Sequence, residues 1–498
     1  MKTIELIRHP YRYFPYELEL AKREVRALFN PNSISETDRG LLLQGPIDPD
    51  LADRLVYFAR ASQGDHILHT LQSRLERANG NGPNRQSTRY SSHGLHEYKG
   101  KFNPQIARAI LNFLNIPIGA KVIDPFCGSG TTLLECDHLG IHAIGLDINP
   151  LAVFIANAKL EAVRIPVSRL NQILGAVLKR YRKINLPLQS QNSHRQEYLL
   201  SWFDEGIYRE IEKIRLSIEM EAESATSPLL AIASNLLRDY SQQDPKDLRI
   251  RRRKTPLPEI PFLQAFEEAA RFFINKLEDA QRIIRFSSNS RALQLDSREL
   301  KADQPNMTEK FDCALTSPPY ATALPYIDTQ RLSLVWLGLI PPSEILPLEA
   351  KLIGSREIRG GQSKTCLLAS LENNHDRIPD AQANYCLFLK NALGPNDGFR
   401  RKALPVLLYR YFSSMNQVFR ALKPFMNKNA PFALIVGGNH TVLGGQRYEI
   451  NTPHHLAEIA ESCGWTHLET IPLQTYQRYG YHVDNAVTSE SIVILRAT

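Results

Sequence analysis

The chain has 498 residues and a formal net charge of +8, with 60 Lys and Arg against 52 Asp and Glu. Its 43% hydrophobic and 22% charged residues argue against wholesale disorder and against a collagen-like structure. No window approaches the ~18 uninterrupted apolar residues of a membrane helix, and the N-terminal residues lack the apolar run of a signal peptide. The six cysteines form no CxxC pair, so we expect no disulfide framework, no bound metal and a cytoplasmic location.

Residues 1–90 are predicted to form an N-terminal extension of helices and loops. Helical spacing of apolar residues covers 12–29 and 51–77. The run 79–84, rich in Asn and Gly, then breaks any regular structure.

From residue 91 onward the pattern alternates between short strands and helices. The predicted strands are 121–123, 142–146, 292–295, 313–316, 432–436 and 491–495. The predicted helices include 105–114, one ending at 139, 404–421 and 454–462. Residues 161–289 differ, because helical periodicity dominates there and charge is dense. We therefore expect one α/β domain in two parts, 91–160 and 290–498, with a mainly helical insertion, 161–289, between them.

A glycine-rich loop follows the first predicted strand of this domain and runs from Asp124 to Thr131. It is neither GxGxxG nor a Walker loop, since no Lys follows its glycines. Asp124 would repel a pyrophosphate but suits a cationic ligand. Asp147 ends the next strand, where a carboxylate can accept both hydroxyls of a ribose. S-adenosylmethionine (SAM) has an ammonium, a sulfonium and a ribose but no phosphate, so it fits this pattern; the alternative is an ordinary tight turn.

A second loop, Ser317-Pro318-Pro319-Tyr320, follows the strand at 313–316. Its prolines stiffen the backbone and remove two N–H donors. The Ser317 hydroxyl and the carbonyls of Ser317 and Pro318 remain as acceptors, and an aromatic ring comes next. This combination suits a planar group with an NH₂, although a proline-rich turn with a buried Tyr is the simpler alternative.

Together, these two loops resemble the signatures of SAM-dependent DNA amino-methyltransferases. The family has a Phe-x-Gly-x-Gly loop, matched by Phe126 to Gly130, and a later (Asp/Asn/Ser)-Pro-Pro-(Tyr/Phe) loop, matched by Ser317 to Tyr320. The segment 96–104 resembles the one that covers the methionine end of SAM in this family, and 295–298 resembles its third acidic motif, which contacts the adenine. The Ser variant looks most like the cytosine-N4 enzymes.

The resemblance implies a Rossmann-like α/β methyltransferase domain that uses SAM to methylate the N4 amine of cytosine in duplex DNA after base flipping. The catalytic residues would be Ser317, Pro318, Pro319 and Tyr320. The residues that would bind the cofactor are Tyr98, Lys101, Phe102, Asp124, Phe126, Gly128, Gly130, Thr131, Asp147 and Asp296. The adenine-N6 amine, an RNA substrate and a non-catalytic SAM- or DNA-binding subunit remain as alternatives.

The most basic run of the chain lies in the helical insertion and includes Arg249, Arg251, Arg252, Arg253 and Lys254. Such a run is either a solvated surface or a contact to DNA phosphates. Its position between the two loops favours target recognition by residues 161–289. Double-stranded DNA is therefore the expected partner, with a restriction or defence protein as a possible second one and no membrane.

Overall fold

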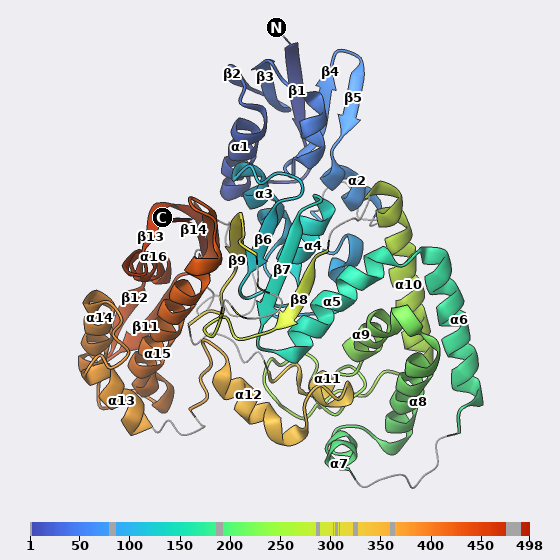
Figure 1. Ribbon diagram of the computed structural model, residues 1–498. Coiled ribbons are helices and arrows are strands. Elements are labelled where there is room, and N and C mark those ends of the chain that lie inside the picture. The colour runs from blue at the N-terminus through green and yellow to red at the C-terminus, as the bar shows by residue number, and fades with distance from the viewer. Residues whose placement is uncertain are drawn as a thin grey trace.

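The structure is a computed structural model that describes residues 2–78, 86–185, 193–284, 289–301, 303, 307, 309–321, 327–358, 364–474 and 490–498 (Figure 1). The break predicted at 79–84 lies outside the described residues. Within these ranges, no helix combines the length and the apolar character needed to cross a membrane.

The N-terminal part is a five-stranded antiparallel sheet in the order β2-β3-β1-β4-β5, with α1 beside it (Figure 1). Its elements are β1 (Lys2–Arg8), α1 (Pro15–Phe29), β2 (Ser33–Thr37), β3 (Gly40–Gly45), β4 (Phe58–Gln63), β5 (His66–His69) and α2 (Leu71–Ala78). Helix α1 confirms the prediction at 12–29 and α2 confirms the end of the predicted helix at 51–77, but the five strands contradict an extension built of helices and loops alone. The strands are short, so the alternation of buried residues such as Ile4 and Leu6 covers too few positions to stand out, and β4 and β5 lie inside the window 51–77 that was interpreted as helical.

The main sheet has seven strands in the order β13-β14-β10-β9-β6-β7-β8. These are β6 (Lys121–Asp124), β7 (His142–Asp147), β8 (Arg291–Gln294), β9 (Cys313–Thr316), β10 (Pro431–Gly437), β13 (Trp465–Leu473) and β14 (Glu490–Ala497). Strands β8, β7, β6, β9 and β10 are parallel, whereas β14 runs antiparallel to β10 and to β13. The six predicted strands are present, and β13 was missed.

The chain reverses its direction of travel across the sheet between β6 and β9. It moves outward from β6 to β7 and β8, then returns to the other side of β6 for β9 and β10. Ligands of open α/β sheets bind at such a switch point, beyond the carboxyl ends of the strands. The topology confirms the predicted Rossmann-like methyltransferase fold, and it locates the expected site between β6 and β9.

Helices cover both faces of the main sheet and build a lobe on either side of it (Figure 1). The helices around the first strands are α3 (Pro104–Phe113), α4 (Thr131–His138) and α5 (Pro150–Arg164). The insertion has α6 (Val167–Lys183), α7 (His194–Leu200), α8 (Glu205–Glu221), α9 (Thr226–Leu236) and α10 (Phe262–Ile283). The remaining helices are α11 (Arg331–Trp336), α12 (Ile345–Lys351), α13 (Lys364–Glu372), α14 (Asp380–Asn391), α15 (Phe399–Leu422) and α16 (Thr452–Ser462). A hairpin of β11 (Asn439–Leu443) and β12 (Gln446–Ile450) belongs to the second lobe.

Two hydrophobic cores lie on opposite faces of the main sheet. Val122 and Ile123 are neighbours on β6 and belong to different cores, as the two-residue period of a strand requires. One core also contains buried residues of the N-terminal sheet and of α6 to α10, and the other contains those of α13 to α16. The helical insertion therefore shares its core with the sheet instead of folding around a core of its own.

Candidate active site

A cavity of about 270 Å³ lies at the carboxyl ends of β6, β7 and β9. Its walls come from six separate parts of the chain, among them both loops singled out in the sequence. The lining residues are Tyr98, Gly100, Lys101, Phe102, Phe126, Cys127, Gly128, Ser129, Thr131, Asp147, Asn149, Ser317, Pro318, Pro319, Tyr320, Leu352, Ile353 and Glu490. All four predicted catalytic residues are among them, as are seven of the ten predicted cofactor residues. The fold thus brings together loops almost two hundred positions apart in sequence.

Asp124 and Gly130 lie beneath the cavity instead of lining it. The buried Asp124 carboxylate accepts hydrogen bonds from the Phe126 amide (3.0 Å) and from the Thr316 hydroxyl (2.5 Å). It therefore ties the glycine loop to the residue just before Ser317. Gly130 has φ +78°, and a Cβ there would lie 2.8 Å from the Cβ of Ala156. These two residues shape the loop, and the direct ligand contact predicted for them is not seen in the cavity wall.

Asp296 also lies outside the cavity wall, and its carboxylate already has a partner. Arg298 holds it with Nε to Oδ1 at 2.9 Å and Nη2 to Oδ2 at 2.5 Å, and donates a further bond to the Lys351 carbonyl. Burial raises the pKa of Asp296, but the hydrogen bonds and charge of Arg298 outweigh it, so the pKa is below its ordinary value. Through Arg298 this carboxylate anchors the chain near α12, and the adenine contact predicted for it stays a prediction.

Asp147 reaches the cavity from the end of β7. One carboxylate oxygen accepts from the Gly128 amide at 3.0 Å, and the other accepts from the Asn149 amide at 2.8 Å. Each oxygen keeps a lone pair for a further donor, such as a ribose hydroxyl. Burial raises the pKa of Asp147 to about 6, an effect that these amide bonds partly offset. The two amide bonds hold the carboxylate in one orientation.

Two lysines flank the glycine loop, and sequence reasoning identified only the first. Lys101 lines the cavity and donates to the carbonyls of His93 (3.2 Å) and Thr88 (3.3 Å), and burial lowers its pKa to about 8. Lys159 is fully buried on α5 and donates to the Ser129 carbonyl (2.8 Å) and hydroxyl (3.0 Å). Burial lowers the pKa of Lys159 well below its ordinary value. The sequence feature that could have identified Lys159 is its position among the mostly apolar residues of α5.

The loop from Ser317 to Tyr320 is fixed by neighbouring strands at both ends. The Ser317 hydroxyl donates to the Ile435 carbonyl on β10 at 3.1 Å, which leaves its lone pairs for other donors. The Tyr320 hydroxyl donates to the carboxylate of Glu490, the first residue of β14. Sequence reasoning missed Glu490 because no motif surrounds it. The position of this carboxylate depends on the pairing of β14 with β10. In that pairing Glu490 lies opposite Gly437, which comes more than fifty residues earlier in the chain.

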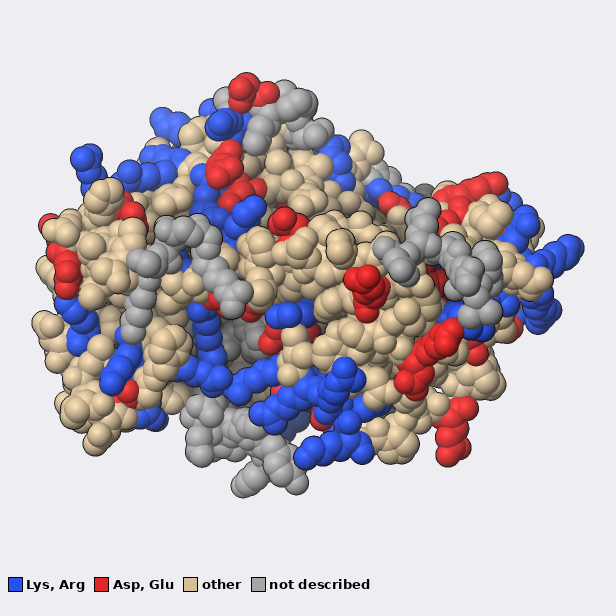
Figure 2. Space-filling model, turned by 90° about the horizontal axis from the view of Figure 1, so that it is seen from below, with Lys and Arg blue, Asp and Glu red and all other residues tan. Residues whose placement is uncertain are grey.

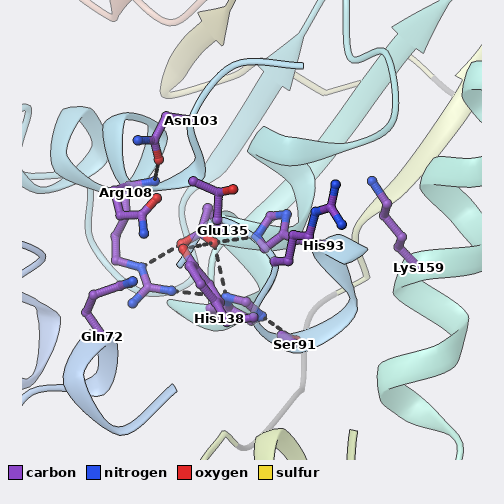
Figure 3. Close-up of polar contacts among 12 residues, drawn as sticks. Gln72, Ser91, His93, Asn103, Arg108, Glu135, His138 and Lys159 are labelled. Carbon is purple, nitrogen blue, oxygen red and sulfur yellow. Dashed lines mark hydrogen bonds and ion pairs between the residues drawn. The ribbon is translucent and has the colours of Figure 1, made fainter. Parts of the chain in front are cut away.

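His93, Glu135 and His138 form a buried group whose ligand atoms could hold a metal ion (Figure 3). The Glu135 carboxylate already accepts from Tyr90 at 2.8 Å, from His93 at 2.7 Å and from the Arg108 guanidinium at 2.6 Å. Figure 3 shows His93 and Arg108 on either side of it. A guanidinium so close to the carboxylate would repel a cation. The group is therefore a structural network between α3 and α4.

The basic run of the insertion divides into two kinds of residue. Arg252 and Arg253 donate to backbone carbonyls of Ser201, Asp239 and Ser241. They therefore attach the basic run to the rest of the insertion. Arg249, Arg251 and Lys254 are exposed, although Arg251 also pairs with Asp247 at 3.0 Å.

Positive charge from other segments gathers near this run. Burial and the charges of Arg400 and Arg249 lower the pKa of Arg356, so positive charge from three segments distant in sequence acts at this position. Figure 2 views the molecule from the side at which the parallel strands end, and shows Lys and Arg side chains in a band across that face. Basic residues therefore border the face on which the cavity lies.

Comparisons with known proteins agree with this site. A family model described as a DNA methylase, of the N6/N4 type, matches residues 59–158. The type II methyltransferase M.MjaII of Methanocaldococcus jannaschii is 41% identical over 93 residues, which are 19% of this chain and 17% of that protein. M.MvaI of Kocuria varians is 26% identical over 270 residues, 51% of this chain and 59% of that protein.

A shorter match links the chain to an RNA enzyme. The tRNA (guanine(10)-N2)-dimethyltransferase of Methanothermobacter thermautotrophicus is 36% identical over 52 residues, 10% of this chain and 16% of that protein. In all three cases the match spans less than two thirds of the relative's own length.

The strand order defines a Rossmann-like α/β fold of the methyltransferase type, with a cavity at its switch point. The family match over residues 59–158 and the type II relatives add that the chain is similar to the DNA amino-methyltransferase family. This family implies SAM as the methyl donor.

Proposed function

We propose that the chain transfers a methyl group from SAM to the exocyclic amine of a base in duplex DNA, with N4 of cytosine as the preferred target. One observation carries this proposal: a single cavity contains both the glycine loop with Asp147 and the loop from Ser317 to Tyr320. The first offers groups for a ribose and the second offers acceptors for an amine. A cofactor and a base can therefore meet in the same space.

The residues of the cavity fit SAM. The Asp147 carboxylate has lone pairs for the ribose hydroxyls, and Lys101 supplies a positive charge for the carboxylate of the methionine moiety. Tyr98, Phe102 and Phe126 add apolar and aromatic surface to the same wall. When bound, the cofactor supplies an electrophilic methyl group on a sulfonium.

The loop from Ser317 to Tyr320 would prepare the amine for attack. An exocyclic amine is a poor nucleophile because its lone pair conjugates with the ring. The Ser317 hydroxyl donates its proton to Ile435, so its oxygen can accept one amine proton, and the Pro318 carbonyl can accept the other. These bonds draw the nitrogen toward tetrahedral geometry. Positioning of this kind can lower a barrier by up to about 7–11 kcal/mol.

The preference for cytosine depends on Ser317, since adenine-N6 enzymes more often carry Asp or Asn at that position of the motif. Adenine N6 is the second candidate, because the same two acceptors could hold its amine. An RNA base is a weaker candidate. The match to the tRNA enzyme covers only 10% of the chain, whereas the match to M.MvaI covers 51%.

Duplex DNA would reach the cavity from the face with the basic band. A target base must leave the helix, at a cost of a few kcal/mol. The exposed residues Arg249, Arg251 and Lys254, together with Arg356 and Arg400, could neutralise phosphates on both sides of the flipped base. Recognition of the target sequence by residues 161–289 and a restriction-enzyme partner remain parts of the proposal.

The test is transfer of labelled methyl from SAM to mixed-sequence duplex DNA and, in parallel, to bulk tRNA. The proposal expects label in DNA and none in tRNA, with loss of at least a hundredfold in Ser317→Ala while SAM still binds. Label in tRNA alone would move the substrate to RNA. Equal labelling of DNA by Ser317→Ala would remove this loop from the mechanism.

A further inference from the structure

We propose that Glu490 is a positioning residue of the active site, which fixes the ring of Tyr320 in the orientation that receives the target base. This inference rests on the proposed function and extends it to a residue outside both signature loops. Glu490 is the first residue of β14, lines the cavity and accepts the hydrogen bond of the Tyr320 hydroxyl.

The backbone of Tyr320 is held from behind by a different segment. Gly354 has φ +77°, and a Cβ there would lie 2.4 Å from the Tyr320 carbonyl oxygen. The neighbouring Leu352 and Ile353 line the cavity next to the loop. Arg410 of α15 fixes this segment through the carbonyls of Ser355 and Glu357. The Tyr320 main chain therefore packs against a segment that is itself fixed by hydrogen bonds.

Without a contact at its hydroxyl, the side chain of Tyr320 could still rotate about its two torsion angles. The hydrogen bond from this hydroxyl to Glu490 prevents that rotation. A hydroxyl that donates to a carboxylate forms one of the stronger protein hydrogen bonds. The anchor itself is rigid, because Glu490 pairs with Gly437 of β10 and with Leu473 of β13. The ring is thus held at the main chain by one segment and at the hydroxyl by the sheet.

A fixed ring matters because a flipped base loses the stacking that it had in the duplex. An aromatic platform that is already in place recovers part of that energy without losing side-chain freedom on binding. It also sets the plane of the base, and so the direction in which the amine lone pair points. A misplacement of about 1 Å can cost a hundredfold in rate. Glu490 would act through this geometry without touching the base.

The test is a double-mutant cycle between Glu490→Ala and Tyr320→Phe, read as single-turnover methylation of mixed-sequence duplex DNA. Each single variant should lower the rate by about ten- to a hundredfold. The double variant should be no slower than the slower single one, since both remove the same bond. The Kd for SAM should not change in any of them. Glu490→Gln keeps an acceptor oxygen, so its methylation rate should fall less than that of Glu490→Ala.

Glu449→Ala is the matched control, because it removes a carboxylate from the exposed pair with Arg447 on the β11–β12 hairpin. It should keep the wild-type rate. A wild-type rate in Glu490→Ala, or single losses that multiply in the double variant, would overturn the inference. Absence of methyl transfer by the wild type would instead overturn the proposed function. In that event, crystal structures of the wild type and of Glu490→Ala still test the inference. An unchanged orientation of the Tyr320 ring in Glu490→Ala would overturn the positioning role.

Discussion

Replacement of Arg108 by Met is expected to destabilise the protein strongly. Arg108 and Glu135 are fully buried, and Nε lies 2.6 Å from the carboxylate. Burial raises the pKa of Glu135, but the charges of Arg108 and His138 and the hydrogen bonds of the network hold it well below its ordinary value, so this carboxylate is ionised. Arg108→Met would leave that charge buried without its guanidinium. Breaking a buried pair in this way costs about 3–5 kcal/mol.

The double replacement Arg108→Met with Glu135→Met should cost less than Arg108→Met alone. It removes both charges and so removes the penalty of the unpaired one. Tyr90 and His93 would lose their acceptor, so some loss would remain. The assay is urea denaturation at pH 7, followed by circular dichroism, for the wild type, Arg108→Met, Glu135→Met and the double variant. A loss below about 1 kcal/mol in Arg108→Met, or strict additivity in the double variant, would refute this reasoning.

Three further predictions concern the cofactor site and the pH dependence of stability. Asp147→Ala should weaken SAM binding by about a hundredfold in calorimetry, since two hydrogen bonds to a carboxylate are lost; unchanged affinity would exclude Asp147 from the site. Gly130→Ala should lower the free energy of unfolding by about 1–3 kcal/mol, because of its φ of +78° and the 2.8 Å approach to Ala156; a melting temperature equal to that of wild type would contradict this. Burial raises the pKa of Glu24 from 4.5 to about 8, so its contribution to stability is fully present below pH 4.5 and is lost as pH rises toward 8. Glu24→Gln should therefore be more stable than wild type at pH 8.5, by on the order of 2 kcal/mol, in the same denaturation assay; a wild-type pH profile would contradict the assignment.

The main sheet could be predicted because most of its strands are buried on both faces. Runs such as Val122-Ile123 and Ala433 to Val436 are apolar throughout and lie directly between turn or helix signals. The N-terminal strands have one face exposed, so their apolar residues are sparse and the helical interpretation failed. Strand β13 was missed for the same reason, since it alternates from Trp465 to Leu473.

The candidate site was predictable where its residues follow one another in the chain. The loops 124–131 and 317–320 carry their own chemistry, and their meeting follows from the order of parallel strands. Lys159 and Glu490 could not be found in this way. Each acts on a loop far away in sequence, so only the tertiary structure brings it there. Asp296 and Arg298, by contrast, are only two residues apart in sequence. The ion pair between them could have been predicted, but it was not considered.

The central claim is that this cavity serves methylation of an exocyclic amine in DNA. The most direct measurement is nucleoside mass spectrometry of mixed-sequence duplex DNA after incubation with the purified protein and methyl-labelled SAM. The account predicts labelled N4-methylcytosine, and none when Ser317→Ala replaces the wild type. Labelled N6-methyladenine would keep the mechanism and overturn the preference for cytosine. Label at carbon 5 of cytosine, or no label in DNA while tRNA is methylated, would contradict the central claim.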